Sequence, residues 1–236
     1  MSPPTGPVLA LDTSTATGSV AVGAGDKLLA EVVLRVGAGH SSALLPAIDY
    51  AMRSAGLAAA DLQAVVVGAG PGSFTGVRVA AATAKGIVHA LGAPLFAFSG
   101  LLAIAAASGF AGRDVCAVLD ARRRDVFAAC YAFDERGVRE VFPPEAFSLD
   151  ALLDRFRGAV APVFAGEGAV LHRDEIKQAL GASVVPEFAG VPRASALLWL
   201  LQTVPHQGLV ADPATWEPEY LRASGAERIA AAAVRP

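Results

Sequence analysis

A short apolar run that ends in an aspartate occurs twice in this chain. Residues 8–12 read Val-Leu-Ala-Leu-Asp, and residues 116–120 read Cys-Ala-Val-Leu-Asp. A polar turn and a strand-like segment follow each run, and a later apolar run enters glycines at 65–68 and again at 162–168. This repetition predicts a duplicated α/β fold of two related lobes, each with the order β-β-β-α-β-α and a mixed sheet flanked by helices.

The length of 236 residues allows one large domain or two small ones. The glycine-containing polar stretch at 108–113 is the best boundary between the halves. It predicts a first lobe at 1–108 and a second at 109–236, whose last helix is able to pack back on the first lobe. The segment 205–218 is rich in proline and is expected to be an ordered loop before a short C-terminal helix.

Composition and charge exclude several classes of protein. Hydrophobic residues make up 54% and charged residues 17% of the chain, which argues against disorder. A net charge of −3 does not suit a protein that holds nucleic acid by itself. The N-terminus lacks a signal-peptide pattern, and Arg78, Lys85 and His89 interrupt the longest alanine-rich stretch, so we expect a cytoplasmic protein without membrane contact.

The glycine loop at 68–76 is the most distinctive segment. It follows a buried strand at 65–67, precedes a helix at about 77–91, and holds four glycines and a proline in Gly-Ala-Gly-Pro-Gly-Ser-Phe-Thr-Gly. It lacks the Lys of a phosphate-binding P-loop and the third glycine of a dinucleotide fingerprint. Glycines let a backbone approach closely and a helix N-terminus favours anions, so the loop suits a phosphate or a tight subunit contact. The alternative is a plain strand-to-helix connection capped by Ser73 or Thr75.

Two polar turns follow the repeated aspartates. Asp12 with Thr13 and Ser14 is able to face a hydrated cation or a phosphate, or these side chains only cap the turn. In the second lobe Arg122, Arg123 and Arg124 suit a phosphate or an acidic surface, or form a solvated hairpin tip. Cys116 and Cys130 are equally distant from Arg123 and are expected to face each other across that hairpin as buried thiols, with a redox role disfavoured.

Two helices carry the expected packing surfaces. The first begins near His40 with Ser41 or Ser42 as N-cap, carries its apolar stripe at 44, 48, 51, 52 and 55, and ends at Gly56. The second, after the glycine loop, is rich in small residues on almost every face, which suggests that another helix packs closely against it.

Catalytic groups are hard to find. The four histidines, His40, His89, His172 and His206, include no pair at i, i+4 spacing for zinc. The sequence has neither a Gly-x-Ser-x-Gly elbow nor a Cys-His signature of a hydrolase. The sequence therefore predicts no catalytic residue and no metal site.

Five blocks stand out in order along the chain. They are residues 9–14, His40 with 44–46, the Gly-Pro-Gly-Ser-Phe-Thr-Gly-Val-Arg run at 70–78, residues 119–123 and Pro-Glu-Tyr-Leu-Arg at 218–222. Together they resemble the TsaB (YeaZ) family of tRNA-modification subunits. The third block is specific, and the five together cover the chain from 8 to 222. The chain departs from the family pattern at Ala80 and Arg124, which are often glycine, and at Phe127, which is often tyrosine.

The resemblance implies an actin-like (ribonuclease H-like) fold and a non-catalytic subunit. Such a subunit dimerises with the catalytic TsaD, works with the ATPase TsaE, and supports transfer of threonylcarbamoyl to adenosine 37 of tRNAs that read A-starting codons. It also implies a homodimer when TsaD is absent. No cofactor is expected on this chain alone, although ATP or ADP is able to bind at the complex interface.

The candidate residues fall into three sets, of which the resemblance implies the first and the chemistry of the turns and the glycine loop suggests the other two. Partner contacts are expected from the two helices, at His40, Leu44, Leu45, Ile48, Met52, Val77, Ala80, Ala81, Ala84 and Val88. Nucleotide or phosphate contacts are expected from Asp12, Thr13, Ser14, Gly70, Gly72, Ser73, Thr75 and Gly76. Contacts with tRNA are expected from Arg122, Arg123 and Arg124.

Two other functions stay open. A stand-alone small-molecule kinase on the same fold would use Asp12 and the glycine loop for ATP, with Asp120 as its single candidate catalytic carboxylate. The peptidase label that some family members carry is disfavoured, because the sequence offers no nucleophile or metal set.

Overall fold

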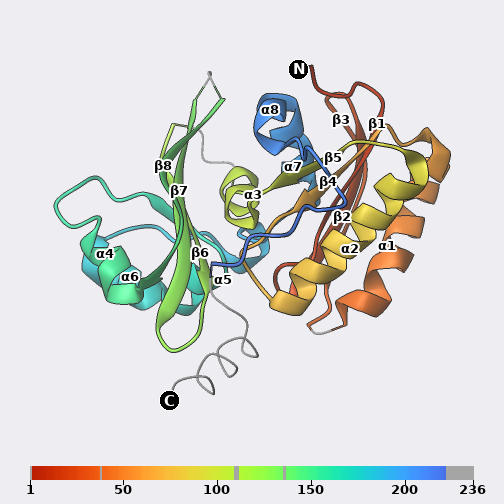
Figure 1. Cartoon of the computed structure of the whole chain (residues 1–236). Helices are drawn as coiled ribbons and strands as arrows, with labels where there is room; N and C mark the ends of the chain where they lie inside the picture. The colour runs from red at the N-terminus through yellow and green to blue at the C-terminus, as the bar shows by residue number, and fades with distance from the viewer. Residues whose placement is uncertain (1, 38, 109–111, 135–136, 222–236) are drawn as a thin grey trace, which may run out of the picture.

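Two sheets form the framework of the protein in a computed structural model that describes residues 2–37, 39–108, 112–134 and 137–221. The first sheet has the strand order β3-β2-β1-β4-β5, and the second has the order β8-β7-β6-β9 (Figure 1). In each sheet the first three strands are antiparallel neighbours, and a later strand joins the first in parallel. The predicted duplicated α/β fold, with a mixed sheet flanked by helices in each half, is therefore confirmed.

The first half of the chain runs in the predicted order. Its elements are β1 (Pro7–Asp12), β2 (Thr17–Ala24), β3 (Lys27–Arg35), α1 (His40–Ser54), the short 3-10 helix η1 (Ala59–Asp61), β4 (Ala64–Gly68), α2 (Phe74–Leu91), β5 (Leu95–Phe98) and α3 (Gly100–Ala107). The second half repeats β-β-β-α-β-α. Its elements are β6 (Val115–Asp120), β7 (Asp125–Asp134), β8 (Gly137–Ser148), α4 (Leu149–Asp154), β9 (Val163–Ala165), α5 (Glu167–Leu171), α6 (Arg173–Leu180), the 3-10 helix η2 (Glu187–Ala189), α7 (Ala194–Thr203) and α8 (Pro205–Gly208).

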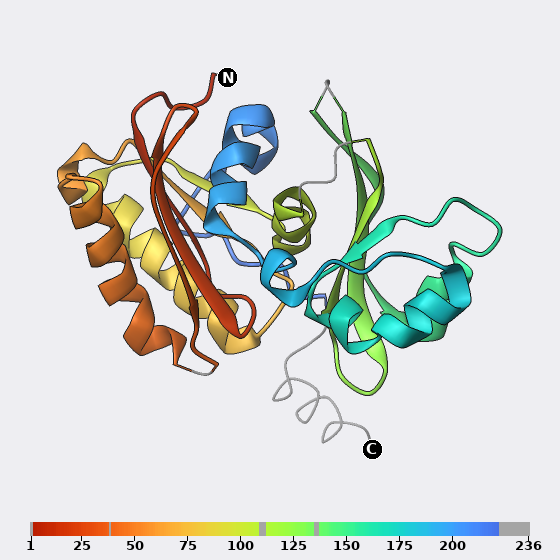
Figure 2. The same cartoon turned by 180° about the vertical axis from the view of Figure 1, so that it is seen from behind.

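The helices divide the apolar interior into three clusters. α1 and α2 cover one face of the first sheet, and α4 and α6 pack against the far face of the second. α3 and α7 lie between the two sheets, as Figure 2 shows from behind. The cluster around them contains buried residues of both sheets, such as Ala10 and Val66 of the first and Ala117 and Ala129 of the second. One continuous apolar core therefore joins the two lobes.

The chain returns to the first lobe at its C-terminal end. α7 packs against β1, β2 and β4, and Leu209 pairs with Phe96 at the edge of β5. Further along, the Lys85 Nζ atom donates a hydrogen bond to the Trp216 carbonyl at 2.9 Å, and the Glu219 N–H donates to the Ala69 carbonyl at 2.9 Å. The segment 205–218 is thus ordered, as expected, but its first four residues form the helix α8 instead of a loop. The expected C-terminal helix, and residues 109–111 of the proposed lobe boundary at 108–113, lie outside the described residues.

The start of α1 differs from the prediction. The N-cap is Gly39 and its first residue is His40, so neither Ser41 nor Ser42 caps the helix, and the Ser42 hydroxyl donates to the Gly39 carbonyl instead. The reason is tertiary: His40 is buried, and its Nε2 atom lies 2.7 Å from the Thr15 carbonyl oxygen. This contact anchors the helix start to the turn after β1. The predicted ends of both helices hold, with Gly56 after α1 and a left-handed Gly92 closing α2.

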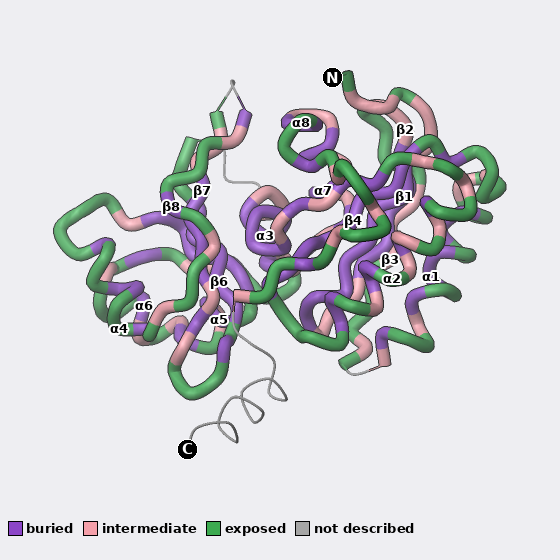
Figure 3. The backbone as a smooth tube through the Cα atoms, viewed as in Figure 1, coloured by how far each residue is buried: buried purple, intermediate pink, exposed green. Residues whose placement is uncertain are grey.

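The central strands β1, β4 and β6 are buried along almost their whole length, as expected of apolar runs, and are purple in Figure 3. No helix in the described ranges has the length and apolar character needed to cross a bilayer.

Candidate functional site

The Asp12 turn begins where β1 ends in the interior. The Asp12 carboxylate is fully buried, and its Oδ1 atom accepts hydrogen bonds from the Ser14 N–H at 2.8 Å and the Ser14 hydroxyl at 2.7 Å. Burial raises the pKa of Asp12, and the two bonds from Ser14 oppose that rise. Its Oδ2 atom has no hydrogen-bond partner within the described part of the chain. The turn thus holds a carboxyl group whose charged form is disfavoured.

The turn after Asp120 in the second lobe repeats one hydrogen bond of this turn, although Asp120 is exposed. The Arg122 N–H donates to the Asp120 carboxylate at 2.8 Å, as the Ser14 N–H does to Asp12. Arg122, Arg123 and Arg124 all adopt left-handed backbone angles, with φ of 66°, 59° and 65°. Side chains of L-residues make this conformation cost about 1–2 kcal/mol per residue. The glycine that the family often has at position 124 would avoid that cost there.

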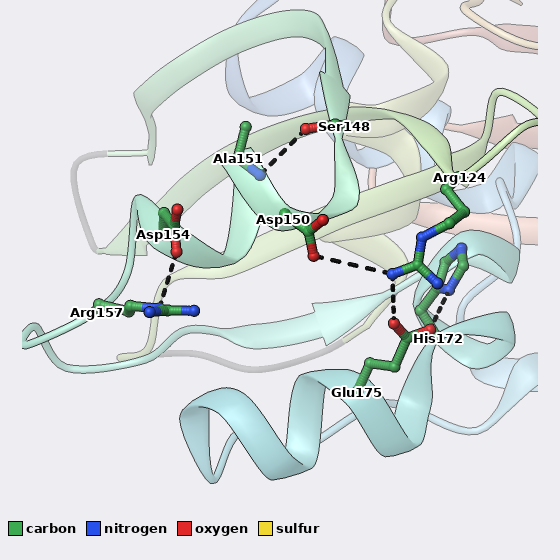
Figure 4. A network of polar contacts seen from close by, with 8 residues as sticks. All are labelled: Arg124, Ser148, Asp150, Ala151, Asp154, Arg157, His172 and Glu175. Atoms are coloured by element: carbon green, nitrogen blue, oxygen red, sulfur yellow. Dashed lines mark hydrogen bonds and ion pairs between the residues drawn. The ribbon is translucent and has the colours of Figure 1, made fainter.

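A polar network holds the last of these arginines (Figure 4). The Arg124 Nη2 atom lies 2.8 Å from Glu175 Oε2 and 3.8 Å from Asp150 Oδ1. The other oxygen of Glu175 lies 3.0 Å from His172 Nδ1. Hydrogen bonds from His172 and then Arg124 lower the pKa of Glu175. Arg124 is therefore engaged with the second lobe, whereas Arg122 lines the space between the lobes.

The glycine loop packs on the Asp12 turn. A Cβ atom on Gly68 would collide with the Asp12 carboxylate, and one on Gly72 would collide with the Ser14 carbonyl oxygen. The Ser73 N–H donates to that same carbonyl at 2.7 Å, and the Ser73 hydroxyl caps α2 by accepting from the Gly76 N–H at 3.3 Å. The predicted alternative of a capped connection is thus present. Close contact with the Asp12 turn accounts for the glycines at 68 and 72.

A cleft of about 560 Å³ separates the two turns. Four of the eight predicted phosphate-binding residues line it, Ser14, Gly72, Ser73 and Thr75, and the other four do not. The opposite wall carries Asp120, Arg122 and Glu167, and the C-terminal segment adds Glu219 and Tyr220. Burial, followed by the charges of Asp120 and Glu187, raises the pKa of Glu167. The cleft therefore combines a helix N-terminus and one guanidinium with three carboxylates.

An aromatic and cationic cluster lies at the rim of this cleft. The Phe74 and Tyr220 ring centroids are 5.2 Å apart, and the Arg78 guanidinium lies 3.9 Å from the Phe74 centroid. Arg78 Nε also donates to the Tyr220 hydroxyl at 3.0 Å. These contacts fix the C-terminal segment to the start of α2. Within the described residues, no three His, Cys, Asp or Glu side chains gather in a way that would hold a metal ion.

Nine of the ten predicted partner-binding residues occupy the inner faces of α1 and α2 and are buried within this chain. Leu45 is the exception, at 61% exposed. It lies on the outer face of α1 with Tyr50, and the outer face of α2 carries Ala82, Gly86 and Ala90. The last three follow i, i+4, i+8 spacing and so share one face. Any contact with a partner at these helices has to be made by this outer surface.

The clasp, a cluster of polar contacts between β3 and the start of α7, was not predicted from the sequence. The Arg193 guanidinium pairs with the Glu31 carboxylate of β3, and the Ser195 hydroxyl donates to Glu31 Oε1 at 2.7 Å. Burial opposes the charge on Glu31, but the bonds from Arg193 and Ser195 outweigh it and lower the Glu31 pKa. These residues are more than 160 positions apart, and no local pattern connects them.

Comparisons with known proteins agree with this architecture. A sequence model of the family described as TsaD, tRNA N6-adenosine threonylcarbamoyltransferase, matches residues 34–227. The tRNA threonylcarbamoyladenosine biosynthesis protein TsaB of Bacillus subtilis is 31% identical over 226 residues, which span 93% of this chain and 96% of the relative. TsaB of Haemophilus influenzae is 39% identical over 51% of each chain.

Two solved structures share the fold of almost the whole chain. The structure of YeaZ from Pseudomonas aeruginosa is 28% identical and superposes with a TM-score of 0.73 over 94% of this chain and 100% of that one. A second structure from the same organism, of a protein described as similar to peptidase YeaZ, has a TM-score of 0.77 with the same identity and coverage. The 31% identity to B. subtilis TsaB extends over almost the whole of both chains, and the YeaZ structures share the fold over 94% of this chain. These matches show that the chain belongs to the TsaB (YeaZ) family.

Proposed function

We propose that this chain is a non-catalytic subunit in the formation of N6-threonylcarbamoyladenosine in tRNA, and that it acts by pairing with a catalytic TsaD-type subunit. The B. subtilis relative is named for this pathway, and the matching family model is described by the transferase activity. The family model that describes the catalytic transferase also matches this chain, which supports a pairing of two related subunits.

The outer face of α2 carries this proposal. A mid-helix glycine costs roughly 0.5–1 kcal/mol relative to alanine. No contact within this chain requires a glycine at position 86, because a Cβ atom built there would meet nothing within 4 Å. Ala82 and Ala90 lie on the same face, and the exposed side chains of Leu45 and Tyr50 belong to the adjacent helix. A helix of a partner that approaches closely would account for small residues here.

The kinase alternative is weaker for three reasons. The three carboxylates of the cleft would repel a triphosphate. The glycines at 68 and 72 are used in packing on the Asp12 turn. The continuous core around α3 and α7 opposes the large lobe closure that such an enzyme would need.

The remaining partners follow from the pairing. A TsaE-type ATPase and tRNA join through the complex, with ATP or ADP at the boundary between its subunits. Arg122 and Arg123 are the candidate tRNA contacts, because Arg124 is held by Glu175 and Asp150. Without TsaD the same helix surface forms a homodimer. We place the protein in the cytoplasm with these partners.

Size-exclusion chromatography with mass measurement tests the pairing. The chain is mixed with a TsaD-type partner, with and without ATP, and a one-to-one species is expected. Ala82→Arg should abolish it, because it buries an unpaired charge at the contact. Ala179→Arg on the exposed face of α6 is the matched control and should pair normally. Pairing that survives Ala82→Arg would remove α2 from the interface.

A further inference from the structure

The two cysteines of the chain lie directly opposite each other in the second sheet. Cys116 of β6 is the register partner of Cys130 of β7. Both side chains point to the face covered by α4 and α6, in one cluster with Val118 and Phe164. Their neighbours Ala117 and Ala129 belong to the cluster on the other face. The two thiols are free and share one side of the sheet.

The hydrogen-bond pattern defines the kind of pair they form. The Ala121 N–H donates to the Asp125 carbonyl at 2.9 Å, so this opposed pair is a hydrogen-bonded one. Hydrogen-bonded and non-bonded pairs alternate along an antiparallel ladder. The ladder of β6 and β7 has no register shift, and Cys116 and Cys130 are five steps from that pair. They therefore form a non-hydrogen-bonded pair.

This geometry suits a covalent bond. Opposed Cα atoms in a non-hydrogen-bonded pair are about 4.5 Å apart, with the side chains at their closest. That spacing lies at the lower end of the range of roughly 4.4–6.8 Å found in disulfides. A shift of either cysteine by one residue would place the two thiols on opposite faces.

The burial of both thiols limits which oxidants are able to reach them. Both cysteines are fully buried. Burial, together with the neighbouring Cys130, holds the pKa of Cys116 well above its usual range, and burial raises the pKa of Cys130 to about 12, with a further contribution from Asp114. The thiols of the closed molecule are therefore protonated and out of reach of bulky disulfides such as oxidised glutathione. A small neutral oxidant that enters through local opening is required.

We propose that Cys116 and Cys130 are a redox-responsive dithiol that hydrogen peroxide converts into an intramolecular cross-strand disulfide. When the structure opens locally, one thiol loses its proton and the thiolate attacks the O–O bond of the peroxide. This step gives a sulfenic acid and a hydroxide ion, which takes up the released proton as the first water. The second sulfur then displaces the hydroxyl of the sulfenic acid, which leaves with a proton as a second water. Two thiols and one peroxide thus give one disulfide and two waters.

The bond would act on the hairpin that carries the arginine turn. The cross-link closes residues 116–130, with Arg122, Arg123 and Arg124 at the tip. That tip is strained, since three consecutive non-glycine residues adopt positive φ. A covalent tie at the base of the hairpin would stiffen the wall of the cleft in the oxidised protein. This inference does not depend on the proposed function.

Peptide mapping of the full-length protein tests it. The native protein is treated with hydrogen peroxide, quenched, alkylated in denaturant and digested with trypsin without reduction. The expected product joins peptides 114–122 and 125–136, which contain no methionine. The thermal midpoint of the oxidised protein should rise by roughly 6–12 °C and return to the original value after reduction.

The variant Ala129→Cys/Cys130→Ala is the matched control, because it keeps two cysteines but moves one to the other face. It should yield no linked peptides after the same exposure. The proposal is overturned if wild type gives only sulfinic or unmodified peptides, or if the control links as fast as wild type. If the wild-type protein forms the linked peptides but its thermal midpoint does not change, the claim that the disulfide stiffens the hairpin is also overturned. The single variant Cys130→Ala should instead yield a dimedone adduct at Cys116.

Discussion

Replacement of Gly86 by alanine separates the stability of this chain from its pairing. The added methyl group meets no atom within 4 Å, and the position lies in the interior of an 18-residue helix. The change should raise the free energy of unfolding by about 0.5–1 kcal/mol, because alanine loses less conformational entropy in a helix. For a chain of this size the thermal midpoint should rise by roughly 1–4 °C.

Pairing should respond in the opposite direction. If the helix of a TsaD-type partner packs against this face, the methyl group overfills the contact at a cost of roughly 1–3 kcal/mol. The dissociation constant should then increase about 5- to 150-fold. Urea unfolding gives the first quantity, and calorimetric titration with the partner gives the second. A more stable variant with unchanged affinity would refute the close helix contact, and a less stable variant would refute the open space around Gly86.

Three further substitutions, at Gly68, Glu31 and Asp12, test contacts inside the protein. Gly68→Ala should destabilise the protein by roughly 1–3 kcal/mol in urea unfolding, because its Cβ atom would collide with the Asp12 carboxylate; stability equal to wild type would contradict the packing of the loop on the turn. Glu31→Ala should cost about 2–3 kcal/mol at pH 7 by breaking the clasp with Arg193 and Ser195. Since the folded pKa of Glu31 is lowered from 4.5, this deficit should shrink as the pH falls below about 4.5, and a deficit that grows in acid would reverse the argument. The folded pKa of Asp12 is raised, so the folded state holds that proton more tightly, and the stability of wild type relative to Asp12→Asn should decline as the pH rises from about 4. A relative stability that increases with pH would exclude the raised pKa.

Local patterns predicted most of the framework. The repeated apolar run with its aspartate predicted both β1 and β6, and the equal distance of Cys116 and Cys130 from Arg123 predicted their opposition. These features depend on neighbours in sequence, on strand alternation and on turn chemistry. The strands β1 and β6, and the register in which Cys116 faces Cys130, confirm both predictions.

Long-range contacts could not be predicted in the same way. The apolar stripe of α1 identifies the face that packs on the sheet, so residues such as Leu44 and Ile48 are buried in the chain itself, and the outer face has no comparable pattern. The clasp between Glu31 and Arg193 and the network from Arg124 to His172 join segments that only the fold brings together. The burial of His40 likewise moved the start of α1.

Reconstituted modification of tRNA tests the central claim most directly. Threonylcarbamoyladenosine formation would be measured with TsaD-type and TsaE-type partners, tRNA, threonylcarbamoyl-AMP and ATP, in the presence of this chain or its variants. The account predicts that product requires the chain, that Ala82→Arg abolishes it, and that Asp120→Asn and Ala179→Arg leave it near the wild-type level. Loss of product with Asp120→Asn in a complex that still assembles would contradict the account, because the chain would then contribute a catalytic group.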